Sequence, residues 1–358
     1  MLFTVAGTLK RITKVTCGQQ AVRKPNVWLH MNECVEVIFL VVWSLTGDLP
    51  YLAEEYGLPH CNSNEFCWMC RADRMARSFT DVSADAAWKA TLLDVHAPHP
   101  RVSGHPVWDI VGIDRWHAPG DLMHTGCLGI LLWLQGAVLW ELQYDGPFHG
   151  TVERRRRALW ELVCAKYDEL DVPANTRLAD LDVARFHSVH GFAELRAKAA
   201  ESRHLLPVLT AVCMHVNTGS PRDRHRVAAL KHVSAVYALV QDSDYIIPDN
   251  VHSAMKDHTN KFFLHYNWLA KNSAERLHLC YHFTSKFHYF WHLIEMAQWL
   301  NPKATWCYEY EHFVGLIIRC ARACVASTRM SLVGVKVADN AVLALHCDLV
   351  RMSQEKLD

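Results

Sequence analysis

The apolar and polar positions along the chain predict a mixed first part and a helical second part. From residue 152 onward, apolar residues recur at the three- and four-residue spacing of amphipathic helices, as Leu159, Trp160 and Val163 do. The same spacing predicts helices at residues 154–167, 192–214, 226–241, 251–279, 309–327 and 338–356. The second part is therefore expected to be dominated by α-helices.

Two long apolar runs stand out in the first part. Residues 35–45 are rich in β-branched and aromatic side chains and are predicted to form a buried strand, with a helix as the alternative. Residues 125–140 carry no charged side chain. This run is shorter than the ~20 apolar residues that cross a bilayer, so a buried helix is expected rather than a membrane span.

Shorter elements are predicted beside these runs. Residues 51–56 follow Pro50 and are expected to form a short helix, because proline is favoured in the first turn. Residues 109–118 are predicted to form a short strand that leads to Asp121.

Composition and charge narrow the class of protein. The 358 residues are 51% hydrophobic and 21% charged, which predicts folded protein nearly throughout. The 37 basic and 37 acidic side chains cancel, so any contact with nucleic acid would need a local basic patch. The 13 cysteines lack a regular spacing, which indicates reduced intracellular thiols rather than a secreted disulfide framework.

Asp48 and Asp121 each end an apolar run at a glycine-flanked turn, which presents a carboxylate at the end of a buried element. Asp121 and His124 would share one face of a helix that begins near Asp121, so an oxygen and a nitrogen ligand could converge there. The alternative is that Asp121 caps the helix and His124 packs in its first turn.

A Cys-x-x-Cys pair and a later His-x-x-His pair have the ligand types and local spacing of a structural zinc site. The candidate ligands are Cys67 and Cys70, completed from Cys61, His60, His96 and His99. The alternative is that the two thiols are unliganded and buried, since free cysteine packs as a small hydrophobe.

Three further features each have a functional and a structural interpretation. His288 and His292 would share a helix face, where such a pair more often packs than binds a metal. The four arginines at 154–157 are either a phosphate-contacting patch or import signal, or a solvated helix start. Glu309 and Glu311 suit the first turn of a helix, and one of them could supply a carboxylate to a distant site.

The order of these motifs resembles the transposases of cut-and-paste DNA transposons in the CACTA-like and related groups, which have an RNase H-like core. The matching features span residues 40–330. In chain order they are the apolar run ending at residues 47–50, Cys67-x-x-Cys70, Asp121-x-x-His124 before a Leu- and Gly-rich helix, a helical insertion, and a Lys-x-His segment before Glu311.

The resemblance implies an α+β fold dominated by helices, with a partial RNase H-like α/β core. The core would occupy residues 1–150 and include the Cys/His segment at about residues 57–105. A helical insertion would follow at 151–280, and residues 281–358 would form C-terminal helices that return to the core.

In such enzymes, three carboxylates hold divalent ions such as Mg²⁺, which activate water and then a DNA 3′-hydroxyl. The resemblance implies that Asp48 is the second acid and Glu311 the third, with Glu309 as an alternate. Asp121 and His124 match the aspartate-x-x-histidine pair that supports the site.

The first catalytic aspartate of these enzymes has no counterpart, because residues 1–47 contain Glu33 and Glu36 as their only acids. The chain is therefore expected to be a truncated or degenerate copy without strand-transfer activity. If Asp48 were instead the first acid and Asp121 the second, the triad would be complete.

The leading hypothesis is thus a transposase-like protein of the nucleus. Its expected partners are DNA and a second copy of the chain, and no membrane contact is expected. Its cofactors would be catalytic Mg²⁺, if it is active, and structural Zn²⁺. One alternative is a non-catalytic, zinc-stabilised module that binds nucleic acid or protein, with the arginines at 154–157 contacting phosphate. Another is a membrane-associated protein built on residues 125–140.

Overall fold

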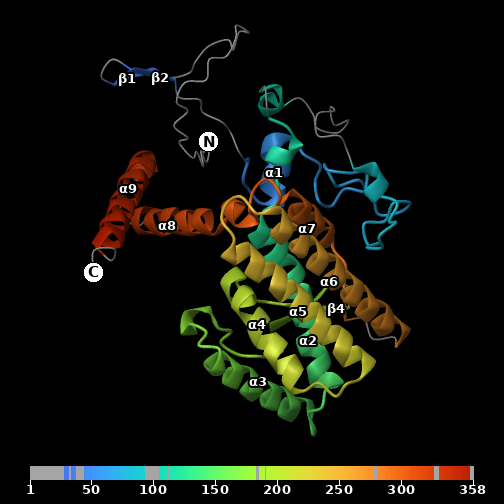
Figure 1. Ribbon diagram of the computed structural model, residues 1–358. Coiled ribbons are helices and arrows are strands. Elements are labelled where there is room, and N and C mark those ends of the chain that lie inside the picture. The colour runs from blue at the N-terminus through green and yellow to red at the C-terminus, as the bar shows by residue number, and fades with distance from the viewer. Residues whose placement is uncertain are drawn as a thin grey trace. The chain divides into compact units, whose positions relative to one another are not determined.

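The computed structural model describes residues 28–31, 34–37, 44–92, 105–110, 113–182, 185–189, 191–276, 280–325 and 330–354. The chain divides into two compact units, Met1–Thr305 and Trp306–Asp358. Helices dominate both (Figure 1). The helix-dominated part of the predicted fold class is confirmed. The strands of the described residues form two antiparallel two-stranded sheets, and an RNase H-like core stays a prediction.

The elements follow one another in this order. The helices of the first unit are α1 (Leu49–Tyr56), α2 (Leu131–Tyr144), α3 (Val152–Glu169), α4 (Ala199–His215), α5 (Pro221–Asp242), α6 (Asp249–Glu275) and α7 (Ser285–Met296), and those of the second unit are α8 (Tyr308–Val325) and α9 (Met330–Gln354). The strands are β1 (Trp28–Met31), β2 (Cys34–Val37), β3 (Phe186–Val189) and β4 (Phe192–Leu195). Single helical turns include η2 (Pro106–Asp109) and η3 (Arg115–His117), and the π-helix η4 (Met123–Ile130) runs directly into α2.

The first unit is built on a helical bundle in which α2, α4, α5 and α6 lie side by side (Figure 1). The continuous helix of η4 and α2 is its centre and packs against α3, α4, α7 and β4. Among the described residues, Met123–Tyr144 is the one helix long and apolar enough to cross a membrane, and 89% of its most apolar window is buried inside the protein. Its lack of a polar face follows from this burial, because other elements cover it on all sides.

A glycine sets how closely β4 approaches α2. A Cβ atom added at Gly136 would lie 2.6 Å from the carbonyl oxygen of Ala193 and 2.6 Å from the amide nitrogen of Leu195. Both distances are shorter than van der Waals contact. The backbone of β4 therefore lies against α2 at a distance that only a glycine permits.

A buried ion cluster joins α2 to α5. Glu141 is completely buried, and its carboxylate accepts hydrogen bonds from Arg222, from Arg226 at 3.1 Å and from the Tyr281 hydroxyl at 2.8 Å. Asp223 also accepts from Arg226, at 2.9 Å. A buried carboxylate is tolerated only when it is paired and hydrogen-bonded, and this cluster meets that condition.

The segment at residues 58–92 has little regular structure and is held by side chains from other elements. The Trp68 indole donates to the carbonyl of Ala118 at 3.2 Å, and Arg115 donates to the carbonyl of Trp68 at 3.0 Å. The Tyr289 hydroxyl on α7 donates to the carbonyl of Phe66 at 2.7 Å. These contacts fix the segment against α7, where the candidate site lies.

Several predicted helices are confirmed, with α1 and α5 matching 51–56 and 226–241 closely. The strand predicted at 109–118 is wrong, because the described part of this stretch begins with the last residue of η2 and contains the turn η3. His105 accepts from the amide of Val107 and Asp114 accepts from that of Trp116, and these caps favour helical turns over an extended strand.

Two other element boundaries differ from the prediction. The helix predicted at 192–214 is the strand β4 followed by α4, since Phe192–Leu195 alternates between half-buried and buried positions and pairs with β3. The strand predicted at 35–45 is described only at its ends. β2 covers Cys34–Val37, residues 44–47 have no regular structure, and residues 38–43 lie outside the described residues.

Candidate metal centre

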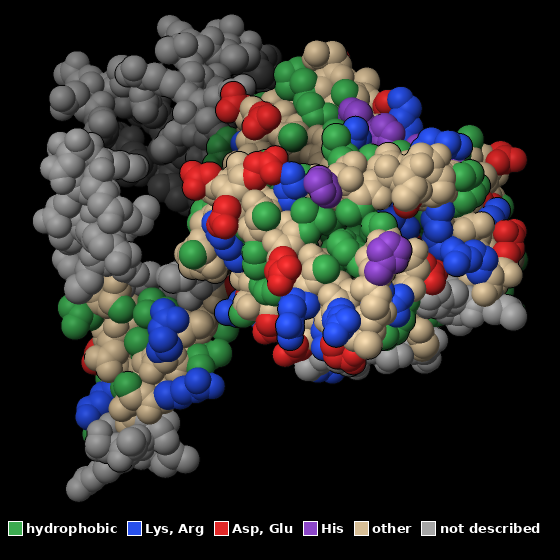
Figure 2. Space-filling model, turned by 90° about the horizontal axis from the view of Figure 1, so that it is seen from below, with side chains coloured by type: hydrophobic (Ala, Val, Ile, Leu, Met, Phe, Trp, Pro, Cys, Tyr) green, Lys and Arg blue, Asp and Glu red, His purple; other side chains and the backbone are tan. Residues whose placement is uncertain are grey.

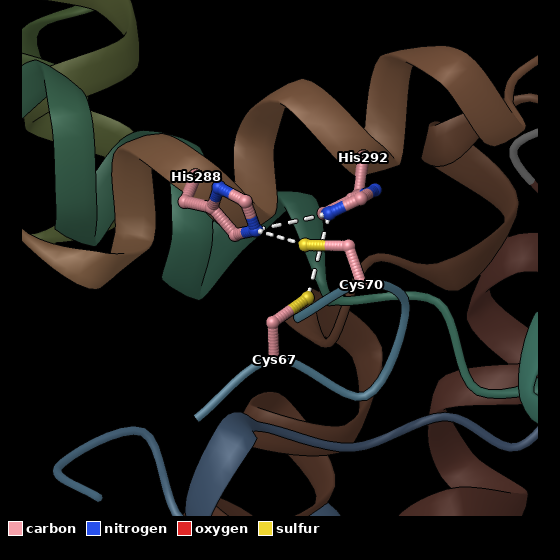
Figure 3. Close-up of side chains that lie close together, drawn as sticks. All are labelled: Cys67, Cys70, His288 and His292. Atoms are coloured by element: carbon pink, nitrogen blue, oxygen red, sulfur yellow. Dashed lines mark hydrogen bonds between the residues drawn. The ribbon is translucent and has the colours of Figure 1, made fainter. Parts of the chain in front are cut away.

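Cys67 and Cys70 lie at a bend of the 58–92 segment. The sulfur of Cys67 accepts from the amide of Met69, and the sulfur of Cys70 accepts from the amide of Ala72, both at 3.3 Å. Figure 3 shows the two sulfur atoms directed toward α7. Backbone amides that donate to both sulfurs stabilise the thiolate form, which is the form that binds metals.

His288 and His292 complete the cluster from one face of α7. They are one helical turn apart, and each is only 2% exposed. Their neighbours Phe287, Tyr289 and Phe290 are also buried, so α7 is fixed by contacts around most of its circumference. A helix fixed in this way presents the two imidazoles in a defined orientation.

The four side chains form a compact group, called here the Cys2His2 cluster. The Sγ atom of Cys67 lies 3.4 Å from Nε2 of His292, and the Sγ atom of Cys70 lies 3.2 Å from Nε2 of His288 (Figure 3). The two Nε2 atoms are 3.0 Å apart, and all four ligand atoms lie within 4.8 Å of one another. The group can hold a metal ion.

These separations fit one small tetrahedral ion. Zinc binds thiolate sulfur at about 2.3 Å and imidazole nitrogen at about 2.0 Å, so tetrahedral angles place sulfur and nitrogen ~3.5 Å apart and two nitrogens ~3.3 Å apart. The observed distances are shorter than these by at most about 0.3 Å. Small side-chain rotations would therefore make the cluster a four-coordinate site.

The electrostatics of the cluster favour a thiolate on Cys67 and a neutral imidazole on His288. Burial raises the pKa of Cys67, but hydrogen bonding from Cys70 and the two imidazoles outweighs it, so the pKa is well below its usual range. Burial and the Cys67 thiolate raise the pKa of Cys70. Burial lowers the pKa of His288, which keeps its imidazole in the neutral form that coordinates metals.

Aromatic rings surround the two histidines. The ring of Trp88 lies 4.4 Å from that of His288, and Phe66 and Trp291 contact the same pair. The Nδ1 atoms of His288 and His292 are buried and have no hydrogen-bond partner among the described residues. The cluster is therefore shielded from water, as expected for a site with a structural role.

Sequence patterns identify the two cysteines and the two histidines as separate pairs, and the fold brings the pairs together. Cys61 is half-buried and does not belong to the Cys2His2 cluster, and its sulfur lies 3.9 Å from Oδ1 of Asn62. His60 is exposed, and it also lies outside the cluster. The candidate ligands His96 and His99 lie outside the described residues.

Asp121 makes the contacts of a helix cap. It is 1% exposed, and its carboxylate accepts from the amide of Met123 at 3.0 Å and from that of His124 at 2.8 Å. Nδ1 of His124 lies 2.6 Å from the same carboxylate. The predicted convergence of Asp121 and His124 on one face is thus observed, together with the capping contacts of the alternative interpretation.

Asp48 is the N-cap of α1, and its carboxylate accepts from the amide of Tyr51 at 2.8 Å. Asp48 and Asp121 act electrostatically on the same lysine, Lys286. Burial lowers the pKa of Lys286, and the carboxylates of Glu194, Asp48 and Asp121 partly offset this effect. Glu309 and Glu311 lie on α8 in the second unit, and their role beside these aspartates stays a prediction.

Comparisons with protein-family models, with curated proteins and with solved structures found no match to this chain. The assignment of a role therefore depends on the residues and their geometry.

Proposed function

We propose that the protein is a transposon-derived, transposase-like protein in which a structural zinc ion joins the 58–92 segment to α7. The observation that carries the zinc site is the convergence of Cys67, Cys70, His288 and His292 in one buried group. Four protein ligands fill the coordination sphere of zinc and leave no position for a substrate, which is the arrangement of structural sites.

The ligand set favours zinc over the other metal that the resemblance implies. Two cysteine sulfurs and two histidine nitrogens match the ligands of Zn²⁺, whereas Mg²⁺ takes oxygen ligands. The motif order supports the transposase origin, because Cys67 and Cys70 fall between Asp48 and Asp121, and His288 and His292 fall before Glu311. The binding of catalytic Mg²⁺ by Asp48, Asp121 and Glu311 is a separate proposal that the resemblance implies.

Zinc content of the purified full-length chain tests the site. We expect one zinc ion per chain in the wild type, and loss of that ion in the Cys67→Ser, Cys70→Ser double variant and in His288→Asn. Cys164→Ser is the matched control, because Cys164 is half-buried on α3 and outside the cluster. Cys61 is a candidate ligand by sequence but lies outside the Cys2His2 cluster in the structure. We therefore expect the Cys61→Ser variant to keep its zinc. Unchanged zinc content in the double variant would overturn the proposal.

Contact with DNA is the second part of the proposed function, and it depends on the arginines at 154–157. They lie in the first two turns of α3, where Arg154 and Arg157 are exposed and Arg155 donates to the carbonyl of Tyr144 at 2.8 Å. Lys and Arg side chains are interspersed with Asp and Glu on the face in Figure 2, so a short run of arginines would have to supply the local positive field.

The salt dependence of DNA binding tests this part. Each phosphate contact releases a counterion, so we expect binding to weaken steeply with salt and the Arg154→Ala, Arg157→Ala variant to show a smaller slope. Arg203→Ala, on α4, is the control for a change of charge elsewhere. An unchanged slope in the double variant would show that these arginines do not contact phosphate.

A further inference from the structure

Four histidines of α5 and α6 gather in a group separate from the Cys2His2 cluster. His225 and His232 are two helical turns apart on α5, and His258 and His265 have the same spacing on α6. The two helices lie side by side (Figure 1). Their pairing is antiparallel, because the earlier histidine of each helix faces the later one of the other.

The four imidazoles form a continuous row, called here the histidine row. Nδ1 of His225 lies 2.9 Å from Nδ1 of His265, and Nδ1 of His232 lies 2.9 Å from Nδ1 of His258. The rings of His232 and His265 stack between these pairs, with centroids 5.6 Å apart and planes 3° apart. Trp268 closes one end by stacking on His225 at 4.0 Å.

All four histidines are half-buried, so solvent and ions reach them. Two neutral imidazoles can share one proton between their Nδ1 atoms, but two protonated imidazoles at this distance would repel each other. A metal ion can take the place of the shared proton. Two nitrogen ligands of one ion lie ~3.3 Å apart, so each pair would need to open only slightly.

We propose that the histidine row is a second metal site, in which each histidine pair binds one borderline transition-metal ion such as Zn²⁺ or Cu²⁺. Imidazole is a preferred ligand of both ions, and the Irving–Williams order places Cu²⁺ above Zn²⁺ in affinity. Water would fill the remaining positions, because each pair supplies two ligands. This site is open and exchangeable, whereas the Cys2His2 cluster is closed and buried.

The charged side chains that act on the row are of mixed sign. The nearby charges are Arg224, Lys261 and Asp257, and Asp257 and Lys261 form an ion pair at 2.7 Å. Arg224 donates to the carbonyl of Gly219. Burial, and then the neighbouring imidazoles, lower the pKa of His225 and His232, and burial lowers that of His265.

The test is calorimetric titration of the full chain with Zn²⁺, and separately with Cu²⁺, after the Cys2His2 cluster has been loaded with zinc and free metal removed. We expect binding of one ion per histidine pair beyond the tightly held zinc. The His232→Asn, His258→Asn variant should lose one of these ions, and the His225→Asn, His265→Asn variant the other. Paramagnetic resonance of the Cu²⁺ form should show coupling to imidazole nitrogen.

His215→Asn is the matched control, because His215 is an exposed histidine at the end of α4 and outside the row. Zinc content and circular dichroism of each variant establish that the fold and the Cys2His2 cluster are intact. Retention of both additional ions when all four histidines of the row are replaced would overturn the proposal. Binding in the wild type no tighter than in that fourfold variant would overturn it as well.

Discussion

The Sγ atom of Cys70 lies 3.2 Å from Nε2 of His288, although 218 residues separate them along the chain. Both residues are buried, and no regular strand or helix of the 58–92 segment reaches α7 at this point. A metal ion bound here would therefore link two distant parts of the first unit directly. The dependence of stability on that ion follows from this relationship.

We predict that removal of the metal destabilises the protein. The free energy of metal binding to a structural site contributes to folding, so Cys70→Ser should lower the free energy of unfolding by roughly 3 kcal/mol or more. A strong chelator should lower the melting temperature of the wild type and leave that of Cys70→Ser unchanged. Thermal unfolding with and without chelator checks this, with Cys164→Ser as control. Equal chelator effects on wild type and Cys70→Ser would contradict the prediction.

We predict that the histidine row makes stability fall as the pH is lowered. The folded-state pKa values of His225, His232 and His265 are lowered, with burial as the first cause. As the pH falls, the unfolded chain therefore binds protons at these histidines before the folded protein does. The stability that the lowered pKa values contribute is fully present above the unfolded pKa of about 6.5, and it is lost as the pH falls below that value toward the folded pKa values. Acidification from about pH 7.5 to about pH 5.5 should therefore destabilise the protein.

Urea unfolding at several pH values measures this slope. The His225→Asn, His265→Asn variant should show a shallower slope than the wild type, because two of the shifted groups are gone. Both proteins must carry the buried zinc, so that the Cys2His2 cluster contributes equally. His215→Asn should keep the wild-type slope. A variant slope as steep as that of the wild type would assign the effect to other groups.

We predict that Glu141→Gln strongly destabilises the first unit. The substitution keeps the volume but removes the charge that pairs with Arg222 and Arg226, and Arg226 keeps only its second partner, Asp223. Breaking a buried pair in this way costs about 3–5 kcal/mol. Tyr281→Phe removes one hydrogen bond to the same carboxylate and should cost only about 1 kcal/mol. Urea unfolding of the two variants should preserve this order, and a reversed order would show that the ion pairs contribute little.

We predict that Gly136→Ala destabilises the protein by about 1–3 kcal/mol, because the new methyl group would overlap the backbone of β4. Gly334 is the matched control, since it lies on α9 and an added Cβ meets nothing within 4 Å. Gly334→Ala should stabilise its helix by about 0.4–1 kcal/mol through the entropy of the unfolded chain. Thermal unfolding should show a lower melting temperature for Gly136→Ala and a higher one for Gly334→Ala. Equal small changes in the two variants would mean that β4 moves aside at little cost.

The transposase-like proposal predicts little or no DNA nicking by the chain with Mg²⁺ or Mn²⁺, because residues 1–47 contain no aspartate for the first position of the triad that the resemblance implies. Asp48→Ala, Asp121→Ala and Glu311→Ala are the informative variants. Asp121→Ala also removes a buried cap, so its folding must be checked by circular dichroism. Robust cleavage that all three substitutions abolish would establish that Asp48 is the first acid and that the triad is complete.

The spacing of apolar residues predicts most of the helices, but it does not predict which residues form the candidate metal site. Helical periodicity located α5 and α6 to within a few residues, because their burial follows the helical repeat. The four-residue strand β4 was missed, since its alternation is too short to distinguish from the first turn of a helix. Its position depends on Gly136, a contact made across the fold.

The metal ligands show the same limit. Cys67 and Cys70 form a recognisable pair, as do His288 and His292, but neither sequence pair indicates the other. Cys70 and His288 are 218 residues apart, and no known ligand spacing connects residues at such a distance. Sequence reasoning therefore favours ligands that lie closer in the chain, such as His96 and His99. The signal in the sequence is the four-residue spacing of His288 and His292 within a run of aromatic residues.

The separation of the two ligand pairs has a consequence for biosynthesis. A ribosome exposes Cys67 and Cys70 long before it has made α7, so zinc cannot be fully coordinated by this site until most of the chain has been synthesised. Contacts between such distant residues also form late and slowly during folding. Until then the two thiols depend on a reducing environment or on another metal-binding partner to stay unoxidised. Zinc acquisition would thus mark the time at which the first unit becomes complete.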